Sequence, residues 1–328
     1  MILFLFLMLV LIATLAIGWM MSHSLNRIGR VDLEKEQQTW IAPEEVRQSE
    51  TAAAPAEETE SAPELIWTRP EVKEKTQNIQ NILLIGQDRR PGEGRARSDS
   101  MILCSFNADT GKIILTSLMR DMYVPFPGDY IDNRINAAYP IGGMSFLDQL
   151  IEEDFGVHVD GNVEVDFDGF LQAMAMLAPL DIELKSYEVG YMNNGNDWHM
   201  QEGVNSMNAE QLLRYARMRY AGHGDWERTE RQRVVLRAAF EKVKGLSIRE
   251  LTELADALLP NFTTDLTNPE ILRYVYLLVT RRMSIGETYR LPVDGSYTEQ
   301  SIRGMAVLVP DLEQNSEYLH AYIYGSQP

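Results

Sequence analysis

Residues 81–88, Asn81-Ile82-Leu83-Leu84-Ile85-Gly86-Gln87-Asp88, decide the fold, because their near-continuous apolar run is typical of a strand covered on both faces. A second run of this kind follows at Met101-Ile102-Leu103-Cys104-Ser105-Phe106. Asp109-Thr110-Gly111 then predicts a turn into a third strand over residues 112–116, so the second and third strands are expected to form a hairpin. Strands buried in this way need helices on both sides of their sheet.

The apolar pattern outward from these strands predicts alternating helices and strands. Helices are predicted over residues 144–155, 168–177, 208–219, 227–243, 248–259 and 269–283. Further strands are predicted near Val163, Ile182, Tyr289 and Val307. We therefore expect an α/β fold, a layered α/β/α domain with a mixed central sheet, over residues 79–328.

The N-terminal segment has a different character, because residues 2–21 contain no charged side chain. A helix of about twenty residues spans roughly 30 Å, the thickness of a bilayer core. We expect residues 1–21 to form one transmembrane anchor. A cleaved signal peptide is the alternative, but no basic region precedes the run and no clear cleavage site follows it.

The charges that follow this run bear on the orientation of the anchor in two opposite ways. Arg27 and Arg30 follow the apolar segment, which by the positive-inside rule favours a cytoplasmic domain. Three acids follow closely, however, and the remaining sequence has the character of an exported domain: Asp32, Glu34 and Glu36. We expect a single-pass protein of the cell membrane whose folded domain lies on the extracellular side.

Residues 22–78 are rich in Glu, Gln, Ala, Pro, Ser and Thr, as in Ser49-Glu50-Thr51-Ala52-Ala53-Ala54-Pro55. Such a segment has too little apolar surface to offset the loss of chain entropy, so we expect a flexible extracellular tether. Cys104 is the only cysteine and lies within an apolar run, so it is expected to be a small buried hydrophobic side chain.

Arginine is concentrated in residues 212–237, which hold seven arginines, no lysine and three acids in a chain of formal charge −18. A planar guanidinium binds phosphate oxygens through two parallel hydrogen bonds, whereas lysine supplies a point charge. The segment therefore predicts a phosphate ligand, the alternative being a solvated helix face or a set of ion pairs. A nucleic-acid-binding regulator is disfavoured, because the overall negative charge would repel nucleic acid outside this segment and the N-terminal apolar run predicts a membrane protein; no nucleic-acid partner is expected.

Acidic residues follow the predicted strands. Asp88 comes after the first strand, Asp99 precedes the second, and Arg120-Asp121 follows the third. Two carboxylates at neighbouring strand ends can share one metal, and Mg²⁺ binds through one or two carboxylates together with phosphate oxygens. Asp88 and Asp99 are therefore candidate ligands of Mg²⁺, with Mn²⁺ as the alternative, although an Asp in such a turn often only caps the turn.

The arginine segment also has informative geometry. Arg217 and Arg219 are about 200° apart on an ideal helix, so both reach one ligand only if the helix ends there, and Gly222-His223-Gly224 is expected to end it. Arg228 and Gln232 share one face of the next helix, near an N-terminus that favours anions. Asp225 is either the N-cap of that helix or part of the site. Arg231 and Arg233 are expected at the surface or in ion pairs.

Seven motifs in this order resemble the LytR-CpsA-Psr family of membrane-anchored cell-wall enzymes. The resemblance is strong over residues 81–245 and loose beyond them. The motifs are residues 81–88, Arg97-Ser98-Asp99-Ser100, Arg120-Asp121-Met122-Tyr123-Val124, Ile135-Asn136-Ala137-Ala138-Tyr139 with Gly142-Gly143, Asp166-Phe167-Asp168-Gly169-Phe170, Tyr215-Ala216-Arg217-Met218-Arg219, and residues 225–232.

This resemblance implies a phosphotransferase that moves a glycopolymer, such as teichoic acid or capsule, from a polyprenyl-pyrophosphate carrier to a hydroxyl of peptidoglycan. Asp88 and Asp99 would hold Mg²⁺. Asp121 and Asp225 are both candidates for activating the acceptor hydroxyl, with Arg120 as a further catalytic residue. The pyrophosphate would be bound by Arg97, Arg120, Arg217, Arg219, Arg228 and Gln232.

Two features depart from the family pattern. Met119 stands where a proline commonly precedes the Arg-Asp pair, and Ala178-Pro179-Leu180 replaces the usual Gly-Gly. Both changes affect backbone turns and leave the charged residues in place. A non-catalytic module that only binds polyprenyl pyrophosphate, or a pyrophosphatase, is the alternative to the transferase.

Overall fold

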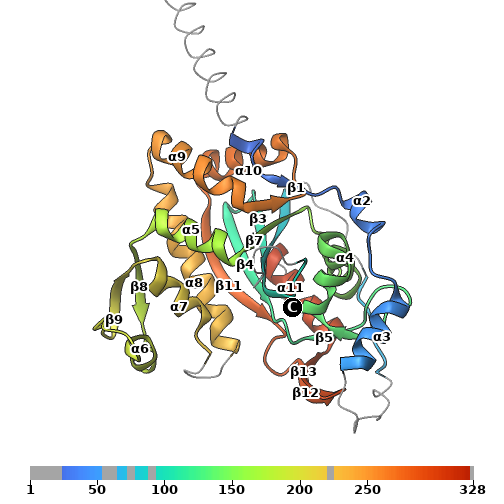
Figure 1. Ribbon diagram of the computed structural model, residues 1–328. Helices are drawn as coiled ribbons and strands as arrows, with labels where there is room; N and C mark the ends of the chain where they lie inside the picture. The colour runs from blue at the N-terminus through green and yellow to red at the C-terminus, as the bar shows by residue number, and fades with distance from the viewer. Residues whose placement is uncertain (1–23, 54–64, 72–77, 88–93, 220–224, 326–328) are drawn as a thin grey trace, which may run out of the picture.

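A mixed seven-stranded sheet forms the centre of the computed structural model, which describes residues 24–53, 65–71, 78–87, 94–219 and 225–325 (Figure 1). The pairs β2/β7, β4/β11 and β1/β10 are parallel, whereas β2/β3, β3/β4 and β7/β10 are antiparallel. The strands follow one another across the sheet as β1 (Gly29–Arg30), β10 (Phe262–Thr264), β7 (Gly161–Asp166), β2 (Ile79–Gln87), β3 (Ser98–Asn107), β4 (Lys112–Leu118) and β11 (Ser284–Leu291).

Helices cover both faces of this sheet, which confirms the three layers predicted from the buried strands. Leu83 and Ile85 of β2 pack in one core with α4 (Ala138–Phe155) and α11 (Leu312–Tyr324). Ile82 and Leu84, which alternate with them, pack in another core with α8 (Asp225–Lys244) and α10 (Asn268–Thr280). Cys104 is buried in this second core, as expected for a small apolar side chain.

A separate apolar core lies beside the sheet (Figure 1). Helix α8 belongs to both, because Val235 packs in this core and the next residue, Leu236, packs against the sheet. The start of α8 is thereby fixed relative to the sheet edge. The other elements of this core are α5 (Phe167–Leu177), β8 (Leu180–Leu184), α6 (Ser186–Asn193), β9 (Gly203–Met207), α7 (Ala209–Arg217) and α9 (Ile248–Leu258).

Each predicted helix and strand has a counterpart, and the predicted hairpin is the antiparallel pair β3/β4. The elements not yet named are α2 (Leu33–Gln37), α3 (Pro43–Ala53), β5 (Tyr123–Val124), β6 (Asn133–Arg134), two 3₁₀ turns (Ile135–Ala137 and Leu259–Asn261), β12 (Tyr297–Ile302) and β13 (Met305–Pro310). Elements of two or three residues were not predicted, since so short a stretch carries no periodicity, and the longer α6, β9, β12 and α11 were also missed.

The structure differs from the predicted tether over residues 24–53, which form β1, α2 and α3 and pack on the domain. Glu36 is buried, and its carboxylate accepts hydrogen bonds from the Ser145 amide (2.9 Å) and from Arg95 (2.9 Å). Trp40 donates to the Ser145 hydroxyl at 3.0 Å. Composition misses this segment because its few buried side chains find their partners elsewhere in the chain.

No helix within the described ranges is long and apolar enough to cross a membrane. The predicted anchor, residues 1–21, lies outside those ranges, as do residues 54–64 and 72–77 of the predicted tether. Residues 65–71 lie against the domain, where Trp67 donates to Asp132 at 2.7 Å and Arg69 pairs with Asp154 at 3.0 Å.

Glu36→Ala should lower the free energy of unfolding by about 1–3 kcal/mol, because it leaves the Ser145 amide and Arg95 without their acceptor. Glu34→Ala is the matched control, since Glu34 is exposed two residues away. Urea unfolding of both variants measures the difference. Equal stability of the two variants would mean that the segment does not belong to the folded domain.

Candidate active site

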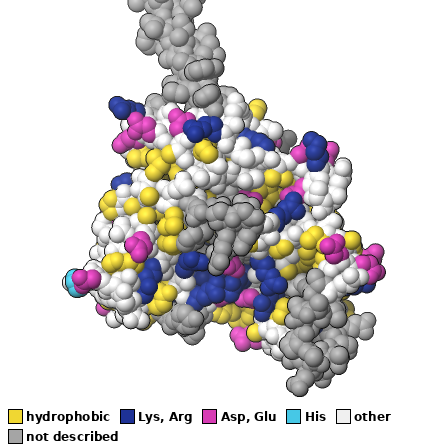
Figure 2. Space-filling view, viewed as in Figure 1, with side chains coloured by type: hydrophobic (Ala, Val, Ile, Leu, Met, Phe, Trp, Pro, Cys, Tyr) yellow, Lys and Arg dark blue, Asp and Glu magenta, His cyan; other side chains and the backbone are white. Residues whose placement is uncertain are grey.

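Charged side chains gather at the end of the sheet where β4 ends and β3 begins, next to the start of α8. Arg120 and Asp121 follow β4, Asp99 is the second residue of β3, and Asp225 is the first residue of α8. In Figure 2, basic side chains with acids among them gather near the middle of the face shown, where α8 begins in Figure 1. Residues far apart in the sequence thus meet at one place.

Arg120 is the centre of this cluster and is 20% exposed. Its guanidinium donates to Asp99 Oδ1 at 2.8 Å and, through Nε, to Asp225 Oδ2 at 3.1 Å. Burial lowers the pKa of Arg120, but the bond to Asp99 and the charges of Asp121 and Asp225 outweigh it, so the pKa is raised. Arg120 therefore stays charged and holds β3 to α8.

Asp225 pairs with three arginines rather than acting only as a helix cap. Besides Arg120, its Oδ1 lies 3.6 Å from Arg219 Nε and 3.5 Å from Arg228 Nε. Burial alone would raise the pKa of Asp225, but the charges of Arg228 and Arg120 lower it below its usual value. Asp225 is therefore ionised at neutral pH and gathers the arginines around it.

Asp121 has a different environment. Its carboxylate lies between Arg120 Nε (3.4 Å) and Arg134 Nε (3.6 Å). Burial raises the pKa of Asp121, and the neighbouring Asp225 carboxyl raises it further against the effect of the two arginines. The two acids that the sequence left equivalent thus have pKa values shifted in opposite directions.

The first turns of α8 supply two further residues, as their spacing predicted. The Arg228 side chain is only 4% exposed and donates to the Asp99 carbonyl at 3.4 Å. Burial lowers the pKa of Arg228 to about 10, which still leaves it charged at neutral pH. Gln232, one turn later, accepts a hydrogen bond from the Ser100 hydroxyl at 3.0 Å.

Helix α7 ends at Arg217, two residues before the predicted end, so the condition for Arg217 and Arg219 to reach one ligand is met. The break comes at Met218, whose backbone is extended (ψ 126°) and whose side chain is fully buried. Both arginines are exposed, and Arg219 reaches Asp225 from this non-helical backbone. Gly222-His223-Gly224, expected to cause the break, lies outside the described residues.

The other arginines of α8 have structural contacts. Arg231 forms buried ion pairs with Glu188 and Glu227, both at 2.6 Å, and donates to the Met218 carbonyl at 2.9 Å, as an ion-pair residue would. Arg233 was expected at the surface or in an ion pair, but it is not at the surface, and it forms no ion pair with any residue that the structure describes. Arg233 is buried and donates to the Ser117 hydroxyl at 2.6 Å, because this part of α8 packs on β4.

Of the two proposed metal ligands, the structure describes only Asp99. Asp88 lies outside the described residues, and those residues contain no group of three or more His, Cys, Asp or Glu side chains arranged to hold a metal. Asp99 is 34% exposed and uses one carboxylate oxygen for Arg120. A partly exposed hard oxygen beside arginines fits a cation that takes its remaining ligands from phosphate and water. Arg97 is exposed in the loop before β3.

Sequence reasoning missed two residues of the cluster. Arg134 on β6 approaches Asp121 and also donates to the Ala306 carbonyl at 2.7 Å. Ser100 was quoted within a motif but given no role, and it positions Gln232. The available signal for Arg134 was its place directly before Ile135-Asn136-Ala137-Ala138-Tyr139.

The chain is similar in sequence to known proteins. The chain is 34% identical over 201 residues to the polyisoprenyl-teichoic acid–peptidoglycan teichoic acid transferase TagU of Oceanobacillus iheyensis, a match that covers 58% of the chain and 60% of that protein. It is 27% identical over 220 residues to the regulatory protein MsrR of Staphylococcus aureus, covering 67% and 66%. The matched part therefore spans less than two thirds of the length of TagU.

The fold is also known. The solved structure of the LytR-CPS2A-psr family protein YwtF (TagT) with bound octaprenyl pyrophosphate lipid superposes with a TM-score of 0.57 at 22% identity, over 77% of this chain and 95% of that one. The LytR_cpsA_psr family model matches residues 44–321, which include every member of the charged cluster. The family expected from the seven motifs is thereby confirmed, and the chain belongs to the LytR_cpsA_psr (LytR-CpsA-Psr) family.

Proposed function

We propose that this protein moves a glycopolymer, teichoic acid in the first instance, from a polyprenyl-pyrophosphate carrier to a hydroxyl of peptidoglycan. Family membership and the name of the TagU relative support this activity. The observation that carries it is the network in which Arg120, Arg219 and Arg228 surround Asp225 at the sheet edge. Guanidinium groups in this arrangement match the oxygens of a pyrophosphate.

The reaction exchanges a phosphoanhydride bond for a phosphoester bond. The acceptor oxygen attacks the phosphorus next to the glycopolymer, forming a phosphodiester, while the bond from that phosphorus to the bridging oxygen breaks. Polyprenyl phosphate leaves with the bond's electron pair, and the acceptor proton passes to a base. Such a transfer depends mainly on positioning and on neutralising the phosphate charge.

The arginines supply this neutralisation. Arg120, Arg134, Arg219 and Arg228 face three carboxylates, so the cluster retains an excess positive charge before Arg97 and Arg217 are added. Arg219 is exposed and lies 3.6 Å from Asp225, longer than a normal hydrogen bond. It can therefore turn to a phosphate oxygen at little cost. Gln232, held by Ser100, offers its amide N–H to the same ligand.

Asp121 is the better candidate for the base. A general base works best when its pKa lies near the working pH, and the pKa of Asp121 is raised while that of Asp225 is lowered. Asp225 pairs with three arginines and is better suited to hold them in place. We assign proton acceptance to Asp121 and the positioning of arginines to Asp225.

We also propose that Asp88 and Asp99 hold Mg²⁺, with Mn²⁺ as a substitute. The partly exposed Asp99 carboxylate beside Arg120 supports this assignment. The bound cation would neutralise charge on the pyrophosphate as the polyprenyl phosphate departs. The chain would be anchored in the cell membrane by residues 1–21, with its catalytic domain on the extracellular side.

One experiment separates the candidate functions. The full chain is incubated with a lipid-linked teichoic acid precursor, with and without peptidoglycan. A transferase forms polymer-linked peptidoglycan and releases polyprenyl phosphate only with the acceptor. A pyrophosphatase releases polyprenyl phosphate without the acceptor, and a binding module retains the intact donor. Either of the last two outcomes would contradict the proposal.

Asp99→Asn should abolish the stimulation of transfer by divalent cations and weaken Mn²⁺ binding, measured by electron paramagnetic resonance. The reason is the loss of an anionic oxygen ligand. Glu299→Gln, at an exposed position on β12, is the control and should behave like wild type. Unchanged Mn²⁺ binding by Asp99→Asn, or full activity in excess chelator, would exclude the metal assignment.

Arg120→Lys should lower kcat/KM roughly ten- to hundredfold, because lysine keeps the charge but cannot bond Asp99 and Asp225 simultaneously with the ligand. Arg237→Lys is the control, since Arg237 is exposed and donates only to the Gly286 carbonyl at 2.5 Å in the described contacts. Activities are compared at equal folded protein, judged by thermal melting. Similar losses in both variants would argue against a pyrophosphate pocket.

The pH profile tests the base. Asp121 accepts a proton only when ionised, so activity is present above its pKa and lost as the pH falls through it. Since that pKa is raised, the acid limb of kcat/KM should lie above the ordinary value of about 4. Asp121→Asn should remove this limb and lower kcat by about 10²–10⁴-fold. A limb that persists in Asp121→Asn but disappears in Asp225→Asn would reverse the assignment.

A further inference from the structure

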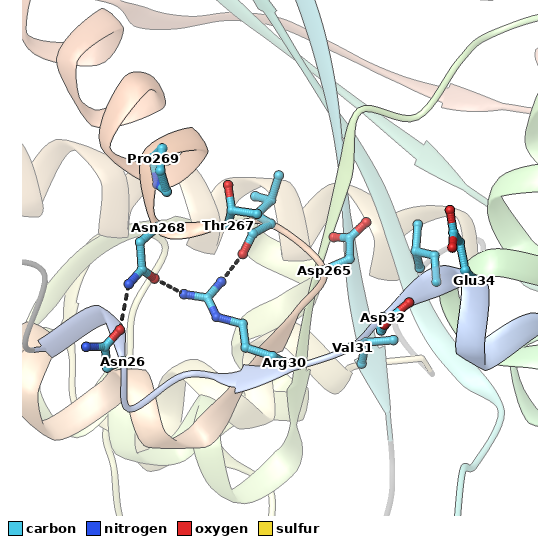
Figure 3. Close-up of a pocket in the computed structure, with 11 residues that line it drawn as sticks. Asn26, Arg30, Val31, Asp32, Glu34, Asp265, Thr267, Asn268 and Pro269 are labelled. Carbon is cyan, nitrogen blue, oxygen red and sulfur yellow. Dashed lines mark hydrogen bonds between the residues drawn. The ribbon is translucent and has the colours of Figure 1, made fainter.

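The first described residues of the chain are bound firmly to one end of the domain. Ser24 donates to Asp256 of α9 at 2.6 Å. Arg30 donates to the Leu266 carbonyl and to the Asn268 side chain, and Asn268 donates to Asn26 at 2.6 Å (Figure 3). Asn26, Arg30 and Asn268 line a cavity of about 720 Å³ between the N-terminal segment and the start of α10. Residues 24–31 therefore have a fixed place on α9 and α10.

This attachment limits how far the domain can lie from the proposed anchor. The uncharged run ends at Met21, three residues before Ser24. Three residues span at most about 11 Å in any conformation. The polar headgroup layer on each side of a bilayer is roughly 5–8 Å thick. An anchor that fills the hydrocarbon core therefore brings Ser24 and Asp256 to the membrane surface, whatever the conformation of the residues between.

The surface at this end is suited to such a position. Helix α10 packs on the sheet through Ile271, Tyr274, Leu277 and Leu278. Leu272, Val275 and Tyr276, spaced as one helical face, belong to none of the apolar cores and are at least partly exposed. Tyr276 is 65% exposed, and Leu251 on the neighbouring α9 is 37% exposed. Tyrosine is enriched where protein meets the bilayer interface.

Charge at this end also differs from the rest of the molecule. Residues 24–28, 248–258 and 268–282 carry five arginines against four acids, a balance of +1 in a chain of −18. Figure 2 shows basic, acidic and apolar side chains interspersed where α9 and α10 lie. The surface therefore does not repel anionic lipid headgroups, as an average surface of this protein would.

We propose that α9 and α10 rest on the lipid surface, with the face formed by Leu251, Leu272, Val275 and Tyr276 in the headgroup layer. This inference rests on the membrane anchor proposed above and is independent of the transfer reaction. The partner is a bilayer that contains anionic lipid. The chain's short reach from Met21 to Ser24 keeps this end of the domain next to the bilayer once the anchor is embedded.

Single cysteines carrying a fluorophore test this face in the full chain, reconstituted into anionic vesicles. The probes are placed by Leu272→Cys and Tyr276→Cys, with the controls Val204→Cys on β9 and Glu299→Cys on β12, both exposed and away from α9 and α10 in Figure 1. Cys104 does not interfere, because burial raises the pKa of its thiol to about 12. Thermal melting confirms that each labelled variant is folded.

Lipids brominated near the headgroup should quench the probes at 272 and 276 severalfold more than those at 204 and 299. Equal quenching at all four positions, or shielding from water without quenching at 272 and 276, would overturn the membrane face, the latter pointing to a second protein copy. Failure of the chain to float with vesicles would overturn the anchor as well. None of these outcomes changes the transfer assay, so the enzymatic proposal is judged separately.

Discussion

The site depends on one partly buried guanidinium. Arg120 joins the start of β3 to the start of α8 through Asp99 and Asp225, which are far apart in the sequence. A buried charge is costly unless it is paired, so each partner is needed to keep the others in place. The Arg120 guanidinium lies about 3 Å from the Asp225 carboxylate, whereas Arg219 and Arg134 lie near 3.6 Å from their carboxylate partners. The cluster is thus rigid at its base and adjustable at its outer side.

Helix α8 carries this rigidity to the rest of the molecule. It contributes to the core on the sheet and to the smaller core beside it, and its first turn enters the site. Buried Arg231 ties α8 to Glu188 of α6 and to the Met218 carbonyl after α7. The backbone next to Arg219 is therefore held by a buried arginine that lies outside the charged cluster. The position of the site therefore depends on the packing of the smaller core.

The sequence predicted the parts of this arrangement that have strong local signals. The runs at residues 81–85 and 101–106 are apolar and bounded by polar turns, so their burial followed directly, as did the shared face of Arg228 and Gln232. Helical periodicity shows which side chains share a face of a helix, but it does not show which other element covers that face. Arg233 could therefore not be recognised as buried. Arg134 carries no periodic signal. Residues 24–53 look unstructured by composition because Glu36 finds its partners more than fifty residues away.

The pairing of β1 with β10 has a consequence for where in the cell envelope the proposed transfer could occur. A domain on a long flexible linker could reach many depths of the wall. This domain, in contrast, is bonded to its own N-terminal segment from Ser24 onward. If the anchor is embedded, the charged cluster is held at one height above the bilayer. In the proposed transfer, only glycan strands that pass through that innermost layer would then be within its reach.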